Sequence, residues 1–209
     1  MLNEQQKLIK TADELRAAAG FPVSLKGEAL PSLFVLSDER RLTNPLKVSE
    51  NLTNSCGIIL RHYHVPDRDR IAKDLLKISL EKGLTFLVAG DTNLATKIGA
   101  DGIHLPENMI EGFNRPKNLR IVTAAVHSKT AITKAINAGV DAVLLSPVLK
   151  TDSHPSLKPL GIDKFGHLVN EVAFPVYALG GINHNTASQI SSSGAAGIAA
   201  VGAFSGTSK

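Results

Sequence analysis

The chain has 209 residues, of which 43% are hydrophobic and 4% aromatic, and 23 basic and 19 acidic residues give a formal net charge of +4. This length and apolar content predict a single domain over residues 1–209, with an N-terminal helical extension over residues 1–30, and exclude a disordered chain. The absence of tryptophan argues against a stacking surface for single-stranded nucleic acid. The mildly basic balance suits anionic small molecules as well as RNA and does not decide between them.

A single cysteine, Cys56, begins an apolar run and cannot form an internal disulfide, so a reducing interior is the expected setting. No stretch reaches the length of about 20 apolar residues that a membrane span needs. The N-terminal residues carry too many charges for a signal peptide. We therefore expect a cytoplasmic protein that binds neither membranes nor nucleic acid.

In chain order, residues 3–19 predict a helix and residues 22–31 predict a loop. Eight short apolar runs follow, and each predicts a strand. They are LFVLS at 33, GIIL at 57, TFLVA at 85, GIHL at 102, RIVTA at 120, AVLLS at 142, VYAL at 176 and GIAAV at 197. Continuous apolar runs, rather than alternating ones, indicate strands that are buried on both faces of a parallel sheet.

The connections between these strands are long enough for helices, and helical patterns occur at 67–82, 129–138, 163–171 and 184–193. Strands that alternate with helices in this way predict a (β/α)₈ TIM barrel, and a doubly wound sheet is the alternative. The sequence leaves no room for a full last helix, so we expect that helix to be missing or truncated. The leading helix then covers either the barrel bottom or part of the outer wall.

Two glycines, Gly180 and Gly181, end the seventh predicted strand, and Gly202 and Ala203 end the eighth. In TIM barrels the loops after these two strands often hold a phosphate. Glycine lets bare N–H groups approach an anion, and a helix that begins after Asn183 would add its positive end. We therefore predict a phosphate site at these four residues, against the alternative that the glycines only form a sharp turn.

Two side chains at strand ends suit catalysis. His127 follows the fifth strand, where an imidazole at the barrel mouth could give and take a proton. Arg61 ends the second strand and could bind an anion or a carboxylate. The alternatives are an exposed histidine and a salt bridge at the rim. His62 and His64 flank Arg61, but no acidic partner is nearby in the pattern, and we predict no metal site.

The sixth strand is followed by a long loop, LKTDSHPSLKPLG, which is the expected position of a lid over the site. Its candidate substrate contacts are Thr151, Asp152 and His154.

Several motifs then combine: GADGIHLP, AVHS, SPVLKTD with a later PLG, and VYALGGIN followed by GAAGIAAVGAF. In order and spacing, across residues 33–204, they resemble the thiamine phosphate synthase and thiazole tautomerase superfamily. The resemblance implies a barrel that binds a thiazole phosphate, with its phosphate at Gly180, Gly181, Gly202 and Ala203.

The synthase branch of this superfamily joins thiazole phosphate to a pyrimidine diphosphate with magnesium. Its pattern has Asn-Asp after the third strand, where this chain has Ala89 and Gly90, and a second acidic ligand after the fourth, where this chain has Met109. Asp91 could act as a shifted ligand. Two lysines and a serine of the synthase pattern are also replaced, by Tyr63, His154 and Ala125.

The tautomerase branch is the closer resemblance. It shares Leu105 and Pro106, the VHS motif with its proton-transferring histidine at His127, and the pair Thr151 and Asp152. That enzyme moves a proton and a double bond within a carboxythiazole phosphate, which requires an acid/base group and an anion clamp but no metal.

From the sequence we therefore predict a thiazole tautomerase-like isomerase that binds a phosphorylated thiazole and needs no cofactor. His127 would be its acid/base group, and Arg61 would lie near the substrate carboxylate. One alternative is a thiamine phosphate synthase with magnesium at an altered metal site. The other is a non-catalytic protein that binds thiazole or thiamine phosphate. The sequence does not determine the oligomeric state, and a homo-oligomer is one alternative.

Overall fold

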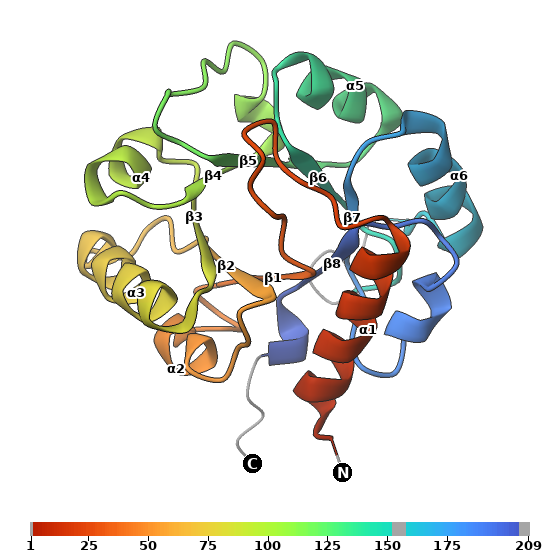
Figure 1. Ribbon diagram of the computed structural model, residues 1–209, viewed down its shortest axis with the longest axis horizontal. Coiled ribbons are helices and arrows are strands. Elements are labelled where there is room, and N and C mark those ends of the chain that lie inside the picture. Colours follow the sequence, from red (N-terminus) through yellow and green to blue (C-terminus); the bar gives the residue numbers. More distant parts are fainter. Residues whose placement is uncertain (1, 152–157, 205–209) are drawn as a thin grey trace.

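The computed structural model describes residues 2–151 and 158–204. In this part of the chain, eight parallel strands pair in sequence order and close into a barrel, because the last strand also pairs with the first (Figure 1). The strands are β1 (Leu33–Leu36), β2 (Cys56–Leu60), β3 (Thr85–Ala89), β4 (Gly102–Leu105), β5 (Ile121–Val126), β6 (Ala142–Leu145), β7 (Val176–Leu179) and β8 (Gly197–Ala200). All eight predicted strands are confirmed, and closure rules out the doubly wound sheet.

The strands are buried on both faces, and their side chains form two separate apolar clusters. One fills the barrel and includes Phe34 and Tyr177, whose ring centroids lie 5.1 Å apart. The other lies between the outward faces of the strands and the surrounding helices. The large rings fit inside because β8 begins with a glycine: a Cβ on Gly197 would lie 2.7 Å from the Tyr177 ring and 2.2 Å from the Ser32 carbonyl oxygen.

Six α-helices and three short 3₁₀ turns surround the barrel in the described residues. The helices are α1 (Glu4–Ala18), α2 (Pro45–Ser49), α3 (Arg68–Lys82), α4 (Thr92–Ile98), α5 (Lys129–Asn137) and α6 (Ile162–Val172), and the 3₁₀ turns are η1 (Glu107–Met109), η2 (Ala187–Ile190) and η3 (Gly202–Phe204). The helices predicted at 3–19, 67–82, 129–138 and 163–171 are confirmed. None of the helices in the described ranges is both long and apolar enough to cross a membrane.

The helix predicted at 184–193 is wrong, because only the four-residue turn η2 forms there. Side chains in this segment bond to the nearby backbone instead. The Asn183 side chain accepts from the Asn185 N–H, and the Ser191 hydroxyl donates to the Ser188 carbonyl. Such local bonds offer the backbone an alternative to the helical pattern, which is why Asn, Ser and Thr are weak helix formers.

The leading helix α1 lies on the outer wall, beside β8 and β1 and against η2 (Figure 1). It begins with a capping box between Asn3 and Gln6 and buries Leu8, Ala12 and Leu15 among its apolar residues. Of the two positions expected for this helix, the outer wall is therefore the observed one. After β8 the described chain continues only as η3, so α1 covers the seam that a final helix would cover in a complete barrel.

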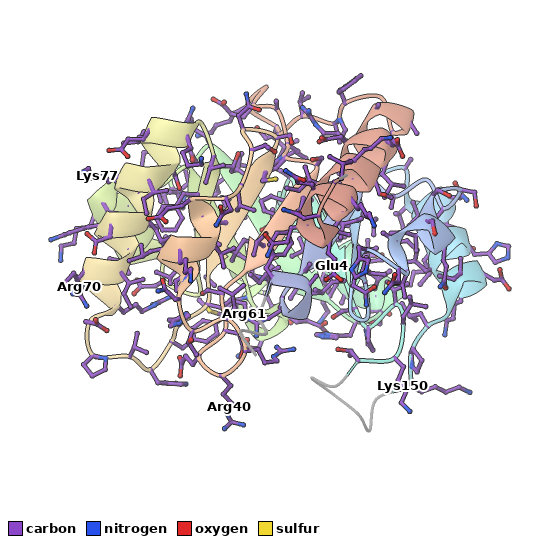
Figure 2. All side chains as sticks on the ribbon, turned by 90° about the horizontal axis from the view of Figure 1, so that it is seen from below. Glu4, Arg40, Arg61, Arg70, Lys77 and Lys150 are labelled. Atoms are coloured by element: carbon purple, nitrogen blue, oxygen red, sulfur yellow. The ribbon has the colours of Figure 1, made fainter. Side chains whose placement is uncertain are left out.

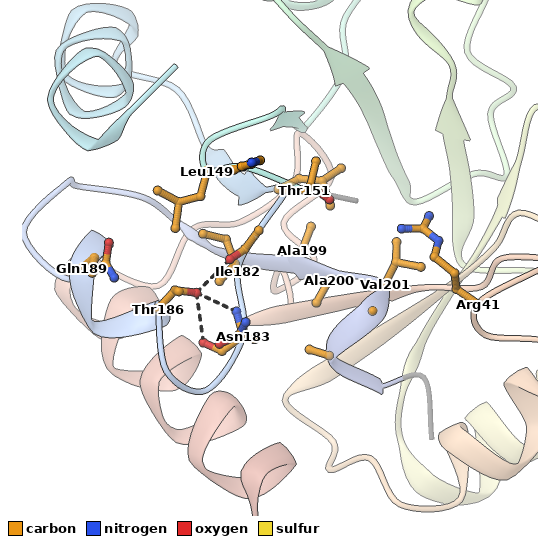
Figure 3. A pocket seen from close by; sticks show the side chains of 16 residues that line it. Arg41, Leu149, Thr151, Ile182, Asn183, Thr186, Gln189, Ala199, Ala200 and Val201 are labelled. Atoms are coloured by element: carbon orange, nitrogen blue, oxygen red, sulfur yellow. Dashed lines mark hydrogen bonds between the residues drawn. The ribbon is translucent and has the colours of Figure 1, made fainter. Parts of the chain in front are cut away.

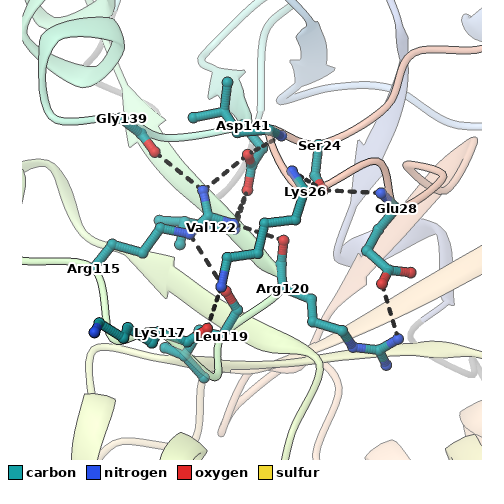
Figure 4. A network of polar contacts seen from close by, with 11 residues as sticks. Ser24, Lys26, Glu28, Arg115, Lys117, Leu119, Arg120, Val122, Gly139 and Asp141 are labelled. Atoms are coloured by element: carbon teal, nitrogen blue, oxygen red, sulfur yellow. Dashed lines mark hydrogen bonds and ion pairs between the residues drawn. The ribbon is translucent and has the colours of Figure 1, made fainter.

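The loop from 20 to 31 crosses the end of the barrel where the strands begin (Figure 1). It is held there by Asp141, whose carboxylate is fully buried (Figure 4). This carboxylate accepts hydrogen bonds from the backbone N–H groups of Leu25 and Val122, at 2.7 and 2.6 Å, and pairs with Arg115 at 2.9 Å. One buried charge therefore joins the loop, β5 and the segment before β6.

Replacing Asp141 with Ala should lower the free energy of unfolding by roughly 3–5 kcal/mol, because it leaves a largely buried guanidinium and two N–H groups without their acceptor. Urea unfolding followed by circular dichroism measures the change. The control is Glu111→Ala, which breaks the exposed ion pair with Lys134 and should have little effect. Equal losses in the two variants would contradict a stabilising role for the buried carboxylate.

Candidate active site

The candidate site lies where the strands end, and the alternation of side chains explains which residues reach it. Arg61, His104 and His127 continue the rows that point into the barrel on β2, β4 and β5. All three line a pocket of about 230 Å³ at the barrel mouth. The other residues lining this mouth pocket are Leu36, Arg41, Tyr63, Pro106, Glu107, Ala125, Ser146, Pro147, Thr151, Leu179, Gly180 and Val201.

The four predicted phosphate-binding residues come together around a second, adjoining cavity of about 910 Å³, here called the glycine cradle (Figure 3). Gly180 and Gly181 approach it from the end of β7, and Gly202 and Ala203 from η3 after β8. Among the described residues, no acceptor receives a hydrogen bond from the backbone N–H groups of Gly180, Gly181 or Ile182. Unpaired backbone donors beside a cavity are the groups that bind a phosphate.

The glycines of the cradle differ in their surroundings. Gly181 has φ +73°, and a Cβ there would lie 2.5 Å from the Lys150 carbonyl oxygen. Gly180 likewise has no room beside Pro147. A Cβ on Gly202, by contrast, would meet no heavy atom within 4 Å. Close backbone packing therefore accounts for the first pair, whereas the missing side chain at Gly202 leaves space in the cradle.

The cradle loop after β7 is fixed by Thr186 rather than by the predicted helix N-terminus. The Thr186 hydroxyl donates to the Gly181 carbonyl oxygen and accepts from the Asn183 N–H, both at 2.9 Å (Figure 3). This turn ties the Gly181 carbonyl to Thr186, which also lines the cradle. These hydrogen bonds of Thr186 fix the conformation of the loop, and the sequence analysis did not predict them.

An acidic residue joins two arginines at the mouth. Asp38, in the loop after β1, accepts from the Arg41 guanidinium at 2.8 Å and from the Arg61 guanidinium at 3.4 Å. Burial opposes ionisation of Asp38, but hydrogen bonds from the Arg41 side chain and from the backbone of Arg40 and Arg41 hold its pKa well below the usual range. Arg61 is thus part of an ion-pair cluster and also lines the mouth pocket, so the two sequence-based readings of this residue are compatible.

His127 is paired with Glu107, a residue of η1 that the sequence analysis missed. The Nδ1 atom of His127 and a carboxylate oxygen of Glu107 lie 2.7 Å apart, and both side chains are about half exposed. A carboxylate at this position can orient the imidazole. The position of His127 after the fifth strand was visible in the sequence, whereas its contact with Glu107 depends on the path of the loop after β4.

His104 also reaches the mouth pocket, although it is buried in the barrel. Its Nδ1 lies 2.9 Å from the Thr123 hydroxyl. Burial, together with the positive charge of Arg61, lowers its pKa to about 3. The side chain is therefore neutral at physiological pH and adds no charge to the mouth.

The remaining candidate residues differ in what the structure describes of them. Thr151 lines both cavities, whereas Asp152 and His154 lie outside the described residues. His62 is buried against the Ser37 hydroxyl at 2.8 Å, which places it in the packing beside β1. Within the described part of the chain, no three His, Cys, Asp or Glu side chains come together as a metal site would require.

Comparison with known proteins assigns this barrel to a family. The sequence profile of the thiamine monophosphate synthase family matches residues 34–204, from β1 to η3. The chain belongs to the thiamine monophosphate synthase family. A thiamine-phosphate synthase of Pyrococcus horikoshii is 31% identical over 180 residues, which cover 84% of this chain and 87% of that protein.

Two further members of the family are similar over most of their length. A thiamine-phosphate synthase of Roseiflexus is 29% identical over 188 residues, covering 83% of this chain and 78% of that protein. The solved structure of thiamine phosphate pyrophosphorylase from Pyrococcus furiosus superposes with a TM-score of 0.70 at 25% identity, covering 85% and 89% of the two chains. These relatives carry the synthase name, and the sequence-based preference for the tautomerase branch is not supported.

The two classes of cradle glycine can be separated by mutation. Gly202→Val should leave the urea midpoint unchanged but weaken binding of inorganic phosphate about tenfold, or ~1.4 kcal/mol, because its side chain enters the cradle. Gly181→Ala should instead lower the free energy of unfolding by about 2 kcal/mol or more, through backbone strain and overlap. Calorimetric titration and urea unfolding measure the two effects. An unchanged phosphate affinity in Gly202→Val would argue against the cradle.

The neutral His104 predicts how stability depends on pH. The unfolded chain takes up a proton near the ordinary histidine pKa of 6.5, whereas the folded chain does so only near 3, so stability falls as pH decreases between these values. In this range His104 contributes up to ~1.4 kcal/mol per pH unit. The variant His104→Gln should therefore lose less stability than the wild type between pH 6.5 and 4 in urea unfolding. Parallel curves for the two proteins would contradict this assignment.

Proposed function

We propose that this protein is a thiamine phosphate synthase that binds a thiazole phosphate with its phosphate in the glycine cradle and its ring at the barrel mouth. The observation that carries the proposal is the juxtaposition of two cavities that share Arg41, Thr151 and Gly180, in a chain of this family. The cradle offers unpaired backbone donors to one phosphate, and the mouth offers guanidinium groups to a second anion. Two anionic substrates are what the joining of thiazole phosphate to a pyrimidine diphosphate requires.

The mouth also has the groups that favour this reaction electrostatically. Joining the two substrates into thiamine phosphate releases diphosphate, so negative charge accumulates on the leaving group as its bond to carbon breaks. Fixed positive groups placed beside a developing charge lower the barrier because they need no reorganisation. In the proposed site, Arg41 and Arg61 are such groups, held in place by Asp38.

A second candidate is the tautomerase reaction, which the His127–Glu107 pair favours. A carboxylate 2.7 Å from the imidazole supports proton transfer within a bound carboxythiazole phosphate. In that case Arg61 would bind the substrate carboxylate across the mouth from His127. The cradle would bind the thiazole phosphate in the same way in both reactions.

Two incubations distinguish these activities. With thiazole phosphate and pyrimidine diphosphate, mass spectrometry should detect thiamine phosphate. With the carboxythiazole phosphate isomer alone in deuterated water, a tautomerase would instead give the aromatic isomer. Tight binding of thiazole phosphate with neither product would contradict both and leave the non-catalytic binder.

Substitution of His127 is a second way to distinguish tautomerase activity from synthase activity. His127→Ala should lower tautomerase turnover by roughly 10²- to 10⁴-fold, as expected for loss of an acid/base group, and Glu107→Gln should lower it by a smaller factor, because the imidazole loses the partner that orients it. Synthase turnover should change far less in both variants. The matched control is His64→Ala, which removes an exposed histidine that lines neither cavity.

A further inference from the structure

The magnesium site expected for the synthase is poorly matched by the residues at the ends of β3 and β4. A Cβ on Gly90 would lie 3.1 Å from the Tyr63 ring, 3.7 Å from Pro106 and 3.8 Å from the Met109 sulfur. Three largely apolar side chains therefore converge where the pattern places carboxylates. Magnesium prefers carboxylate oxygens, and none of these three side chains carries one.

Asp91, the carboxylate next to Gly90 in the chain, is already engaged by other groups. One of its oxygens accepts from the Leu94 N–H at 2.9 Å and caps α4, and the other pairs with Arg68 at 3.2 Å. Arg68 is mostly buried, lies over the Tyr63 ring at 5.6 Å and also donates to the Ala89 carbonyl oxygen. A divalent cation beside Asp91 would thus face a buried guanidinium, so Asp91 does not act as a shifted ligand.

We infer that Arg41 and Arg61, which are both held in position by Asp38, bind the diphosphate of the second substrate at the mouth. We also infer that this binding needs no metal ion. The inference rests on the proposed synthase and concerns how its diphosphate is held. A guanidinium presents several donors in a fixed plane, which suits the oxygens of a phosphate group. In this role the two arginines supply the positive charge that magnesium would otherwise provide.

The geometry gives the three residues different roles. Arg61 lines only the mouth pocket, whereas Arg41 lines both the mouth and the cradle. Asp38 lines neither cavity. One of its carboxylate oxygens pairs with both guanidiniums, and the other accepts from the backbone N–H of Arg41 in the loop after β1. Asp38 is therefore a positioning residue. Arg41 lies where the two anions of the ternary complex come closest.

The loop also offers a matched control. Arg40 is exposed, lines neither cavity and extends away from the barrel, whereas Arg61 lies closer to the barrel (Figure 2). Only the backbone N–H of Arg40 contacts Asp38. Replacing Arg40 with Ala removes the same charge from the same loop without changing the proposed contacts.

The test is calorimetric titration of the full chain with inorganic pyrophosphate and, separately, with orthophosphate, in EDTA and in magnesium at equal ionic strength. Wild-type protein should bind pyrophosphate in EDTA at least as tightly as in magnesium. Arg61→Ala should weaken pyrophosphate binding by about 10- to 100-fold, the loss expected for a charge-assisted contact, and leave orthophosphate binding within about twofold. Arg41→Ala should weaken the binding of both anions, and Arg40→Ala that of neither.

The outcomes separate this inference from the proposed function. Pyrophosphate binding that disappears in EDTA would overturn the inference while leaving a magnesium-dependent synthase intact. Equal losses in Arg40→Ala and Arg61→Ala would also overturn it, because they would indicate a general charge effect. Metal-independent pyrophosphate binding without thiamine phosphate formation would support the arginine site and contradict the synthase. Circular dichroism of each variant confirms that it is folded.

Discussion

Closure of the sheet by pairing of β8 with β1 is the constraint on which the candidate site depends. It makes β7, β8, β1 and β2 consecutive neighbours, although they come from opposite ends of the chain. The glycine cradle at the ends of β7 and β8 thereby lies next to the loop after β1 and the end of β2. Without closure, Arg41 would not reach both cavities, and the two proposed anion sites would not adjoin.

The eight strands and their parallel arrangement could be predicted from the sequence, because each strand is a continuous apolar run that is buried on both faces. The positions of Arg61 and His127 at the ends of two predicted strands also predicted that they lie at the mouth. The contributions of Asp38, Arg41 and Glu107 could not be predicted, because they depend on loop paths that bring separate segments together. The helix expected at 184–193 failed for a local reason, since polar side chains there bond to the adjacent backbone.

The family assignment concerns the whole barrel, whereas the site residues concern the ends of individual strands. The match over residues 34–204 assigns the barrel to the thiamine monophosphate synthase family, whereas the contacts of Tyr63, Arg68 and Asp91 describe what has changed at the ends of β3 and β4. The Tyr63 ring and the Met109 sulfur both lie within 4 Å of the position that a Cβ on Gly90 would take. The Arg68 guanidinium lies over the Tyr63 ring and pairs with Asp91, so its charge is not isolated.

The position of α1 has a consequence for how the chain reaches this state. Its apolar face, with Leu8 and Leu15, packs against β8, which is the last strand to leave the ribosome. During synthesis this helix must therefore remain exposed until almost the whole barrel has been translated. Contacts between distant segments form slowly, and apolar surfaces that wait for them are prone to aggregation. Nascent chains of this protein are thus expected to expose the apolar face of α1 until β8 is available to cover it.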